Sequence, residues 1–122
     1  MSEALEVGNK VAALLKEGKF EEIYKELYSA DIVSSEPSSP SGDPTSHGIE
    51  AVMKKGDEFM AVHEIHSMKI EGPFPHGDEF ILYMDFDVTN KHMGARFNLV
   101  ECALYKVAGG KIVHERFFYH MG

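Results

Sequence analysis

The sequence predicts an α+β fold in which three N-terminal helices pack on one face of an antiparallel sheet. Apolar residues recur at helical spacing within residues 4–28 and 49–60, whereas from residue 63 onward they alternate with a period of two. Short turns separate the later runs, and such turns connect antiparallel rather than parallel neighbours. Helices followed by a series of strands are typical of the α+β class.

The helical part contains three apolar stripes. Gly18 separates the first two stripes, which predicts a helical hairpin. In chain order, the stripes are Ala4, Val7, Val11, Leu14 and Leu15; Phe20, Ile23, Tyr24, Leu27 and Tyr28; and Ile49, Val52, Met53, Gly56, Phe59 and Met60.

The segment between the second and third helices is predicted to be a short extended stretch and then a long loop. Residues 31–33 form the extended stretch, and residues 34–47 contain six serines and three prolines. A loop of this length is a candidate lid or binding loop in a compact domain. A mobile linker is the alternative.

The second half contains four runs with strand periodicity, at residues 63–71, 79–89, 95–107 and 111–120. In the second run, every other residue from Phe80 to Val88 is apolar, which predicts a face that meets the helices. The intervening residues are expected to point to solvent or to a partner subunit; they are Ile81, Tyr83, Asp85 and Asp87.

Composition limits the possible classes of protein. The 122 residues are 43% hydrophobic and 26% charged, so we expect residues 1–122 to form one domain. A formal net charge of −8 argues against nucleic acid and anionic membranes as partners. No apolar run approaches the ~18 residues of a membrane span, and the N-terminus does not resemble a signal peptide. We therefore expect a cytoplasmic protein.

Carboxylates among apolar strand residues are the main candidate catalytic groups. Glu101 and Glu115 each share a predicted strand face with apolar and aromatic side chains. Burial raises the pKa of a carboxyl group toward neutrality, where it can act as a general acid or base. Adjacent strands could bring the two carboxyl groups close together, and their pKa values would then move apart. The alternatives are that Glu101 pairs with Arg96 or Arg116, and that Glu115 lies on the solvated face.

Two histidines begin the first long strand, and they do not form a metal motif. His63 and His66 are three residues apart, so on a strand their side chains point to opposite faces. His66 shares parity with Met68 and Ile70, which predicts a ring facing the cavity; His63, at the helix–strand junction, could also reach inward. A hydrogen-bonded core histidine is the alternative for either residue. The single cysteine, Cys102, excludes an internal disulfide and a multi-cysteine zinc site.

Five segments, in order and at matching spacing, resemble one known family: YKELYSADIVSSEP, HGIEAVMKKGDEF, GDEFILYMDFDVT, ECALYKV and GGKIVHERFFYHM. The chain resembles the SnoaL-like group of the nuclear-transport-factor-2-like (NTF2-like) superfamily, which includes ketosteroid isomerase. The resemblance implies a cone-shaped fold, with a strongly curved sheet wrapped around the helices and a pocket at its open end. It also implies a homodimer packed through the outer sheet face. Isomerases, cyclases, hydrolases, dehydratases and non-catalytic binding proteins share this fold, so the fold alone does not determine the function.

The resemblance also adds Glu36 to the candidate residues. It implies that Glu36 lies at the pocket mouth, near the position of the catalytic aspartate of ketosteroid isomerase. An exposed loop carboxylate is the alternative.

The function expected from the sequence is the binding of a small, largely apolar molecule in an internal cavity. If the protein is an enzyme, we expect acid–base chemistry without a cofactor or metal, such as isomerisation, aldol-type cyclisation or water addition. The candidate catalytic residues are Glu101, Glu36 and His66. The candidate substrate contacts are Glu115, Tyr119, His63, Phe59 and Phe117. The alternative is a non-catalytic ligand-binding or dimeric interaction module.

Overall fold

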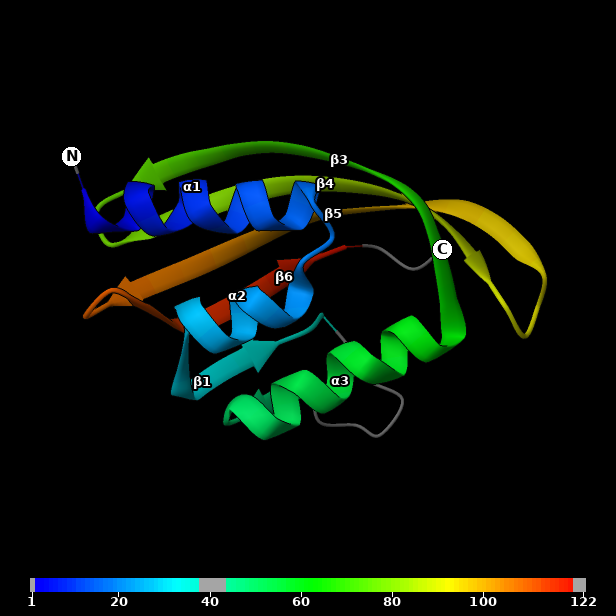
Figure 1. Ribbon diagram of the computed structural model, residues 1–122, viewed down its shortest axis with the longest axis horizontal. Helices are drawn as coiled ribbons and strands as arrows, with labels where there is room; N and C mark the ends of the chain where they lie inside the picture. Colours follow the sequence, from blue (N-terminus) through cyan, green and yellow to red (C-terminus); the bar gives the residue numbers. More distant parts are fainter. Residues whose placement is uncertain (1, 38–43, 120–122) are drawn as a thin grey trace.

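The computed structural model describes residues 2–37 and 44–119, which form three helices and one six-stranded sheet (Figure 1). In chain order, the elements are α1 (Glu3–Lys16), α2 (Phe20–Leu27), β1 (Tyr28–Ser35), β2 (Thr45–His47), α3 (Ile49–Val62), β3 (His63–His76), β4 (Glu79–Asn90), β5 (Ala95–Ala108) and β6 (Lys111–Phe118). The strand order is β2-β1-β6-β5-β4-β3, and the helices pack on one face of the curved sheet. The predicted α+β class is confirmed. None of the helices in the described part is long and apolar enough to cross a membrane.

The sheet is mixed rather than purely antiparallel. Strands β3 to β6 form the expected antiparallel meander. Strand β1, however, runs parallel to β6, so the prediction of a wholly antiparallel sheet is wrong at this position. The chain between β1 and β6 contains α3 and three long strands, and a connection of that length permits parallel pairing.

The segment predicted as a loop at residues 34–47 is partly strand. Ser34 and Ser35 end β1, and β2 pairs with them in an antiparallel arrangement. Residues 38–43, the middle of the predicted lid, lie outside the described residues. Glu36 follows β1 directly, and its backbone N–H donates a hydrogen bond to the carbonyl of Pro44 at 2.8 Å. The position of Glu36 is therefore set by the end of the sheet.

The core lies between the sheet and the helices. On β4, Phe80 and Leu82 are 0% exposed, whereas Ile81 between them is 40% exposed. This alternation confirms the predicted inner and outer faces of the strand. Helix α1 covers the inner face, and its buried stripe includes Val7 and Val11.

Gly8 allows α1 to approach the sheet closely. A Cβ atom at Gly8 would lie 2.7 Å from Cβ of Pro73 and 3.1 Å from the ring of Phe80. In a helix interior, alanine is normally more favourable than glycine by about 1 kcal/mol. Here we expect overpacking to outweigh that preference, so that Gly8→Ala lowers the free energy of unfolding by about 1–2 kcal/mol. Urea denaturation measures the change, and a variant as stable as the native protein would contradict the prediction.

The matched comparison for this substitution is Gly56→Ala, in α3. A Cβ there would meet only the hydroxyl end of Tyr24, at 2.5 Å, and that hydroxyl is the far end of a side chain that can turn. We therefore expect a smaller loss of stability than for Gly8→Ala, although both glycines lie within helices.

Candidate active site

The helices and the inner face of the sheet leave a cavity of about 460 Å³. Its walls come from the three helices and from strands β1, β3, β4, β5 and β6, and they are mostly apolar. The apolar lining includes Val52, Phe59, Ile65, Met84, Phe97 and Leu99. Ionisable side chains also line the cavity, and their arrangement determines what chemistry it can support.

Glu101 reaches the cavity from β5. Burial, followed by the negative charges of Glu36 and Glu115, raises the pKa of Glu101 to about 8, although the positive charge of Lys55 opposes the shift. At pH 7 this carboxyl group is therefore mostly protonated and can donate a proton or a hydrogen bond. The alternative partner Arg96 instead pairs with Asp87 on the outer face, at 2.8 Å.

Glu115 is the most deeply buried of these carboxyl groups, with 2% of its surface exposed. One oxygen accepts a hydrogen bond from the Tyr28 hydroxyl, and the other accepts one from Ser34 Oγ at 2.7 Å. Burial raises the pKa of Glu115, while these two hydrogen bonds and the charge of Lys55 act in the opposite direction without cancelling the effect. Glu115 does not lie on the solvated face.

Lys55 and Glu36 form an ion pair at the cavity wall. The Nζ atom of Lys55 lies 3.2 Å from Oε1 of Glu36, and it donates a hydrogen bond to Ser34 Oγ at 2.6 Å. Among the described residues, the other oxygen of Glu36, Oε2, is buried without a hydrogen-bond partner. Nζ also lies 5.2 Å from the centre of the Phe117 ring, which is within the range of a cation–π contact.

Lys55 is absent from the candidates predicted from the sequence. It lies three residues after Val52 and four before Phe59, so it borders the apolar stripe of α3. This position beside the apolar stripe could have identified Lys55 as a candidate site residue.

Two tyrosines complete the polar part of the cavity. Burial, followed by the charges of Glu36 and Glu101, raises the pKa of Tyr119 to about 12. Burial, followed by the charges of Glu115 and Asp57, raises the pKa of Tyr24 to about 12. Both hydroxyl groups therefore keep their protons at neutral pH and can donate hydrogen bonds to a ligand.

The structure brings seven of the eight predicted site residues to the cavity wall. They are Glu36, Phe59, His63, Glu101, Glu115, Phe117 and Tyr119. Nδ1 of His63 lies 3.1 Å from the carbonyl oxygen of Phe59, and the two rings stack with centroids 4.3 Å apart.

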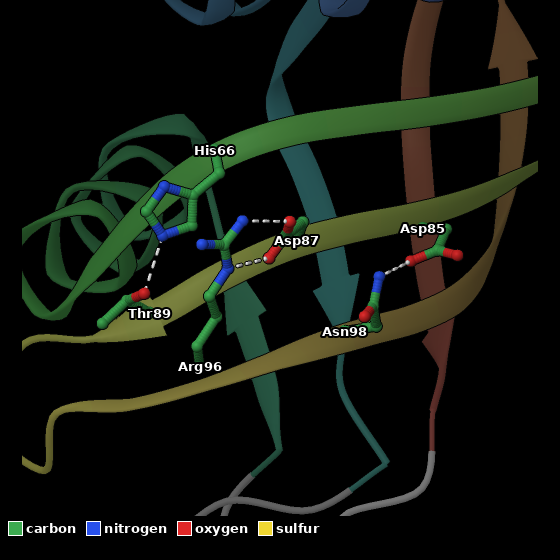
Figure 2. A network of polar contacts seen from close by, with 6 residues as sticks. All are labelled: His66, Asp85, Asp87, Thr89, Arg96 and Asn98. Carbon is green, nitrogen blue, oxygen red and sulfur yellow. Dashed lines mark hydrogen bonds and ion pairs between the residues drawn. The ribbon is translucent and has the colours of Figure 1, made fainter.

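The expected inward orientation of His66 is wrong. The pairing of β3 with β4 shifts register between Ile65 and Ser67, so the alternation of faces is interrupted at His66. The ring lies on the outer face, where Nε2 is 2.7 Å from Oγ1 of Thr89. Figure 2 shows it beside the Arg96–Asp87 ion pair, and it does not line the cavity. His66 is therefore not part of the candidate site.

No three histidine, cysteine, aspartate or glutamate side chains within residues 2–37 and 44–119 are grouped as metal ligands. Cys102 is a free thiol and is exposed.

Comparison with known proteins identifies the family. A family model described as a SnoaL-like domain matches residues 2–119. The chain belongs to the SnoaL-like family. It is 38% identical to a Mesorhizobium loti protein with the provisional names SnoaL-like polyketide cyclase and carbohydrate phosphatase, with a TM-score of 0.89 over 98% of this chain and 100% of that one. No curated protein matches the sequence.

More distant structures share only the fold of this SnoaL-like protein. An NTF2-like protein of unknown function from Burkholderia pseudomallei is 17% identical, with a TM-score of 0.78 over 98% of this chain and 92% of that one. A Catenulispora acidiphila protein with a ketosteroid isomerase-like fold, solved with trimethylamine, is 19% identical, with a TM-score of 0.72 over 90% and 82% of the chains. The chain therefore shares the fold of NTF2-like and ketosteroid isomerase-like structures, and the predicted resemblance to SnoaL-like proteins is confirmed by the family model.

Proposed function

We propose that this SnoaL-like protein is a cofactor-independent enzyme of the isomerase or cyclase type, acting on a small, largely apolar molecule with a carbonyl group. One observation carries the proposal: Glu36 and Glu101, in different electrostatic environments, line the same mostly apolar cavity. Pairs of carboxyl groups held in different protonation states are suited to paired acid and base roles. The first of the two provisional names of the 38% identical Mesorhizobium loti protein, SnoaL-like polyketide cyclase, supports the same class of reaction, whereas the second, carbohydrate phosphatase, does not.

In this proposal, Glu36 is the general base. It pairs with Lys55 as a carboxylate, and its unpartnered oxygen, Oε2, can accept a proton. That proton would come from the carbon next to the carbonyl group of the substrate, leaving an enolate. Return of a proton to another carbon completes an isomerisation, whereas attack of the enolate carbon on a second carbonyl group closes a ring.

Glu101 is the general acid in this scheme. Its carboxyl group, with a pKa of about 8, donates to the oxygen on which negative charge develops. The hydroxyl of Tyr119 gives a second hydrogen bond. The apolar body of the substrate lies against Phe59, His63 and Phe117, which line the cavity. Glu115 holds Tyr28 and Ser34 through its hydrogen bonds rather than contacting substrate directly.

Deuterium exchange tests this proposal with simple ketones in place of the natural substrate. A panel of apolar cyclic ketones is incubated with the protein in D₂O, and NMR follows the loss of protons beside the carbonyl group. We expect exchange of at least one ketone by the native protein. We expect at least about 100-fold slower exchange by Glu101→Gln and Glu36→Gln, because a general acid or base contributes at least that factor.

The control for the exchange experiment is Glu58→Gln, which changes an exposed carboxylate on α3. It should exchange as fast as the native protein. A ketone that binds in the cavity without exchanging would support the non-catalytic binding module instead. Exchange that is equally fast in Glu101→Gln would exclude Glu101 as the acid.

We also propose a cytoplasmic homodimer that associates through the outer sheet face. The large apolar side chains of Ile81, Val100 and Phe118 are 40%, 43% and 46% exposed on this face. Burying such side chains between two subunits is favourable. The exposed free thiol of Cys102 on the same face is consistent with a reducing compartment.

A further inference from the structure

A continuous chain of hydrogen bonds leads from the interior to the proposed base. The Tyr28 hydroxyl donates to one oxygen of Glu115, and Ser34 Oγ donates to the other at 2.7 Å. Lys55 Nζ then donates to Ser34 Oγ at 2.6 Å and pairs with Glu36 at 3.2 Å. The chain therefore joins β6, β1 and α3.

The two ends of this chain differ in burial. Ser34 is 0% exposed and Glu115 is 2% exposed, so the inner end is fixed by packing. The side chains of Lys55 and Glu36 are 28% and 21% exposed, and both line the cavity. Because the hydroxyl proton of Ser34 is donated to Glu115, the lone pairs of Ser34 Oγ are left for Lys55. This directionality holds the ammonium group in one place.

We propose that Lys55, held by the Tyr28–Glu115–Ser34 chain, is a positioning residue that directs the Glu36 carboxylate into the cavity and places a positive charge among the carboxyl groups of the site. The inference deepens the proposed function and rests on it for its role in catalysis. Its electrostatic part can be tested without any ligand.

The charges around Lys55 explain why its removal should matter. Lys55 is the only lysine or arginine among the described residues that line the cavity. Ionisable groups line the cavity or its buried end from every neighbouring element that carries one. They are Glu21 and Tyr24 on α2, Tyr28 on β1, Glu36 after β1, Asp57 on α3, His63 at the start of β3, Glu101 and Tyr105 on β5, Glu115 on β6 and Tyr119 after it. Without the ammonium group, the carboxylates would repel one another with no lysine or arginine beside them.

The test is an NMR titration of the glutamate side-chain carboxyl carbons from pH 4 to pH 10 in ¹³C-labelled protein. Glu101→Gln identifies the Glu101 signal, which in the native protein should titrate near pH 8. In Lys55→Met, we expect the Glu101 midpoint to rise, by up to about one pH unit, because the positive charge that opposes the upward shift has been removed. Lys55→Gln tests the same point if the methionine variant does not fold.

Two further variants test whether the effect is specific to Lys55 and whether it depends on the oxygen that holds its ammonium group. Lys54→Met removes the neighbouring lysine of α3, which is exposed, and should leave the midpoint unchanged. Ser34→Ala keeps the ammonium group but removes the oxygen that holds it, so the midpoint should rise by a smaller amount. An unmoved midpoint in Lys55→Met, or an equal shift in Lys54→Met, overturns the proposal. An unmoved midpoint in Ser34→Ala overturns the part assigned to the chain.

The NMR titration and the deuterium exchange test different claims, so a negative result in one can be told apart from a negative result in the other. If Lys55→Met shifts the Glu101 midpoint but no ketone exchanges, the enzymatic function is wrong and the electrostatic role of Lys55 remains. If exchange occurs, Lys55→Met should move its pH profile together with the Glu101 midpoint. If the Glu101 midpoint moves in Lys55→Met but the pH dependence of the exchange rate does not, Lys55 is excluded as a positioning residue for catalysis.

Discussion

Replacing Glu101 with glutamine should abolish a large part of the loss of stability that the native protein shows as the pH rises from 5 to 8. In the folded protein, Glu101 keeps its proton up to about pH 8, whereas an unperturbed glutamate has a pKa of 4.5. Between these values the folded state binds one more proton than the unfolded state, so stability falls as pH rises. The slope approaches about 1.4 kcal/mol per pH unit. The stabilisation is complete below pH 4.5 and is lost as the pH rises through 8.

Urea denaturation at intervals from pH 5 to pH 9 measures this effect. The amide of Glu101→Gln resembles the protonated carboxyl group, so the variant and the native protein should be similarly stable at pH 5. The variant should be the more stable one by several kcal/mol above pH 8. Some slope will remain in the variant, because the pKa of Glu115 is also raised. Glu58→Gln is the control, and a native slope in Glu101→Gln would show that Glu101 titrates normally.

Glu115→Ala should be among the most destabilising single substitutions, lowering the free energy of unfolding by about 3–5 kcal/mol. It leaves the Tyr28 hydroxyl and Ser34 Oγ without their acceptor at a position that is 2% exposed. Each unsatisfied buried group costs about 1–3 kcal/mol. The space left by the side chain adds a further loss of packing.

Glu115→Gln is the matched variant for this prediction. Its amide oxygen can still accept one of the two hydrogen bonds, but its amide nitrogen cannot accept the other. We therefore expect a smaller loss, of about 1–2 kcal/mol. Urea denaturation of both variants at pH 7 provides the measurement. An alanine variant within about 1 kcal/mol of the native protein would mean that Tyr28 and Ser34 find other partners.

The sequence predicted side-chain orientation well where strand pairing is uninterrupted. The pairing of β4 with β5 continues without a shift from Glu79 to Asn90, so alternation along the chain gives the correct faces. Glu101 lies on this regular part of β5, and its place in the cavity follows from parity alone. On β3, by contrast, the extra residue between Ile65 and Ser67 reverses the expected face of His66. Nothing in the local pattern marks that bulge, because it depends on the partner strand.

Contacts between segments far apart in the chain were the other features that the periodicity of the sequence could not predict. The parallel pairing of β1 with β6 joins Ser34 to Glu115 across 81 positions of the chain. Lys55 acquires its place in the site only because Ser34, 21 residues earlier, comes to lie beside it. Periodicity identifies the buried face of α3, but it does not show which residues of the strands contact that helix.

The bulge in β3 has a consequence for the behaviour of the protein at high concentration. Strand β3 is 14 residues long and forms one edge of the sheet, and a long regular edge can pair with a strand of another molecule and start aggregation. In β3 the register shifts twice, between Ile65 and Ser67 and between Glu71 and Phe74. Pro73 and Pro75 lack the N–H groups that such pairing requires. The irregularity that turns His66 away from the cavity therefore also makes this edge a poor template for fibrils.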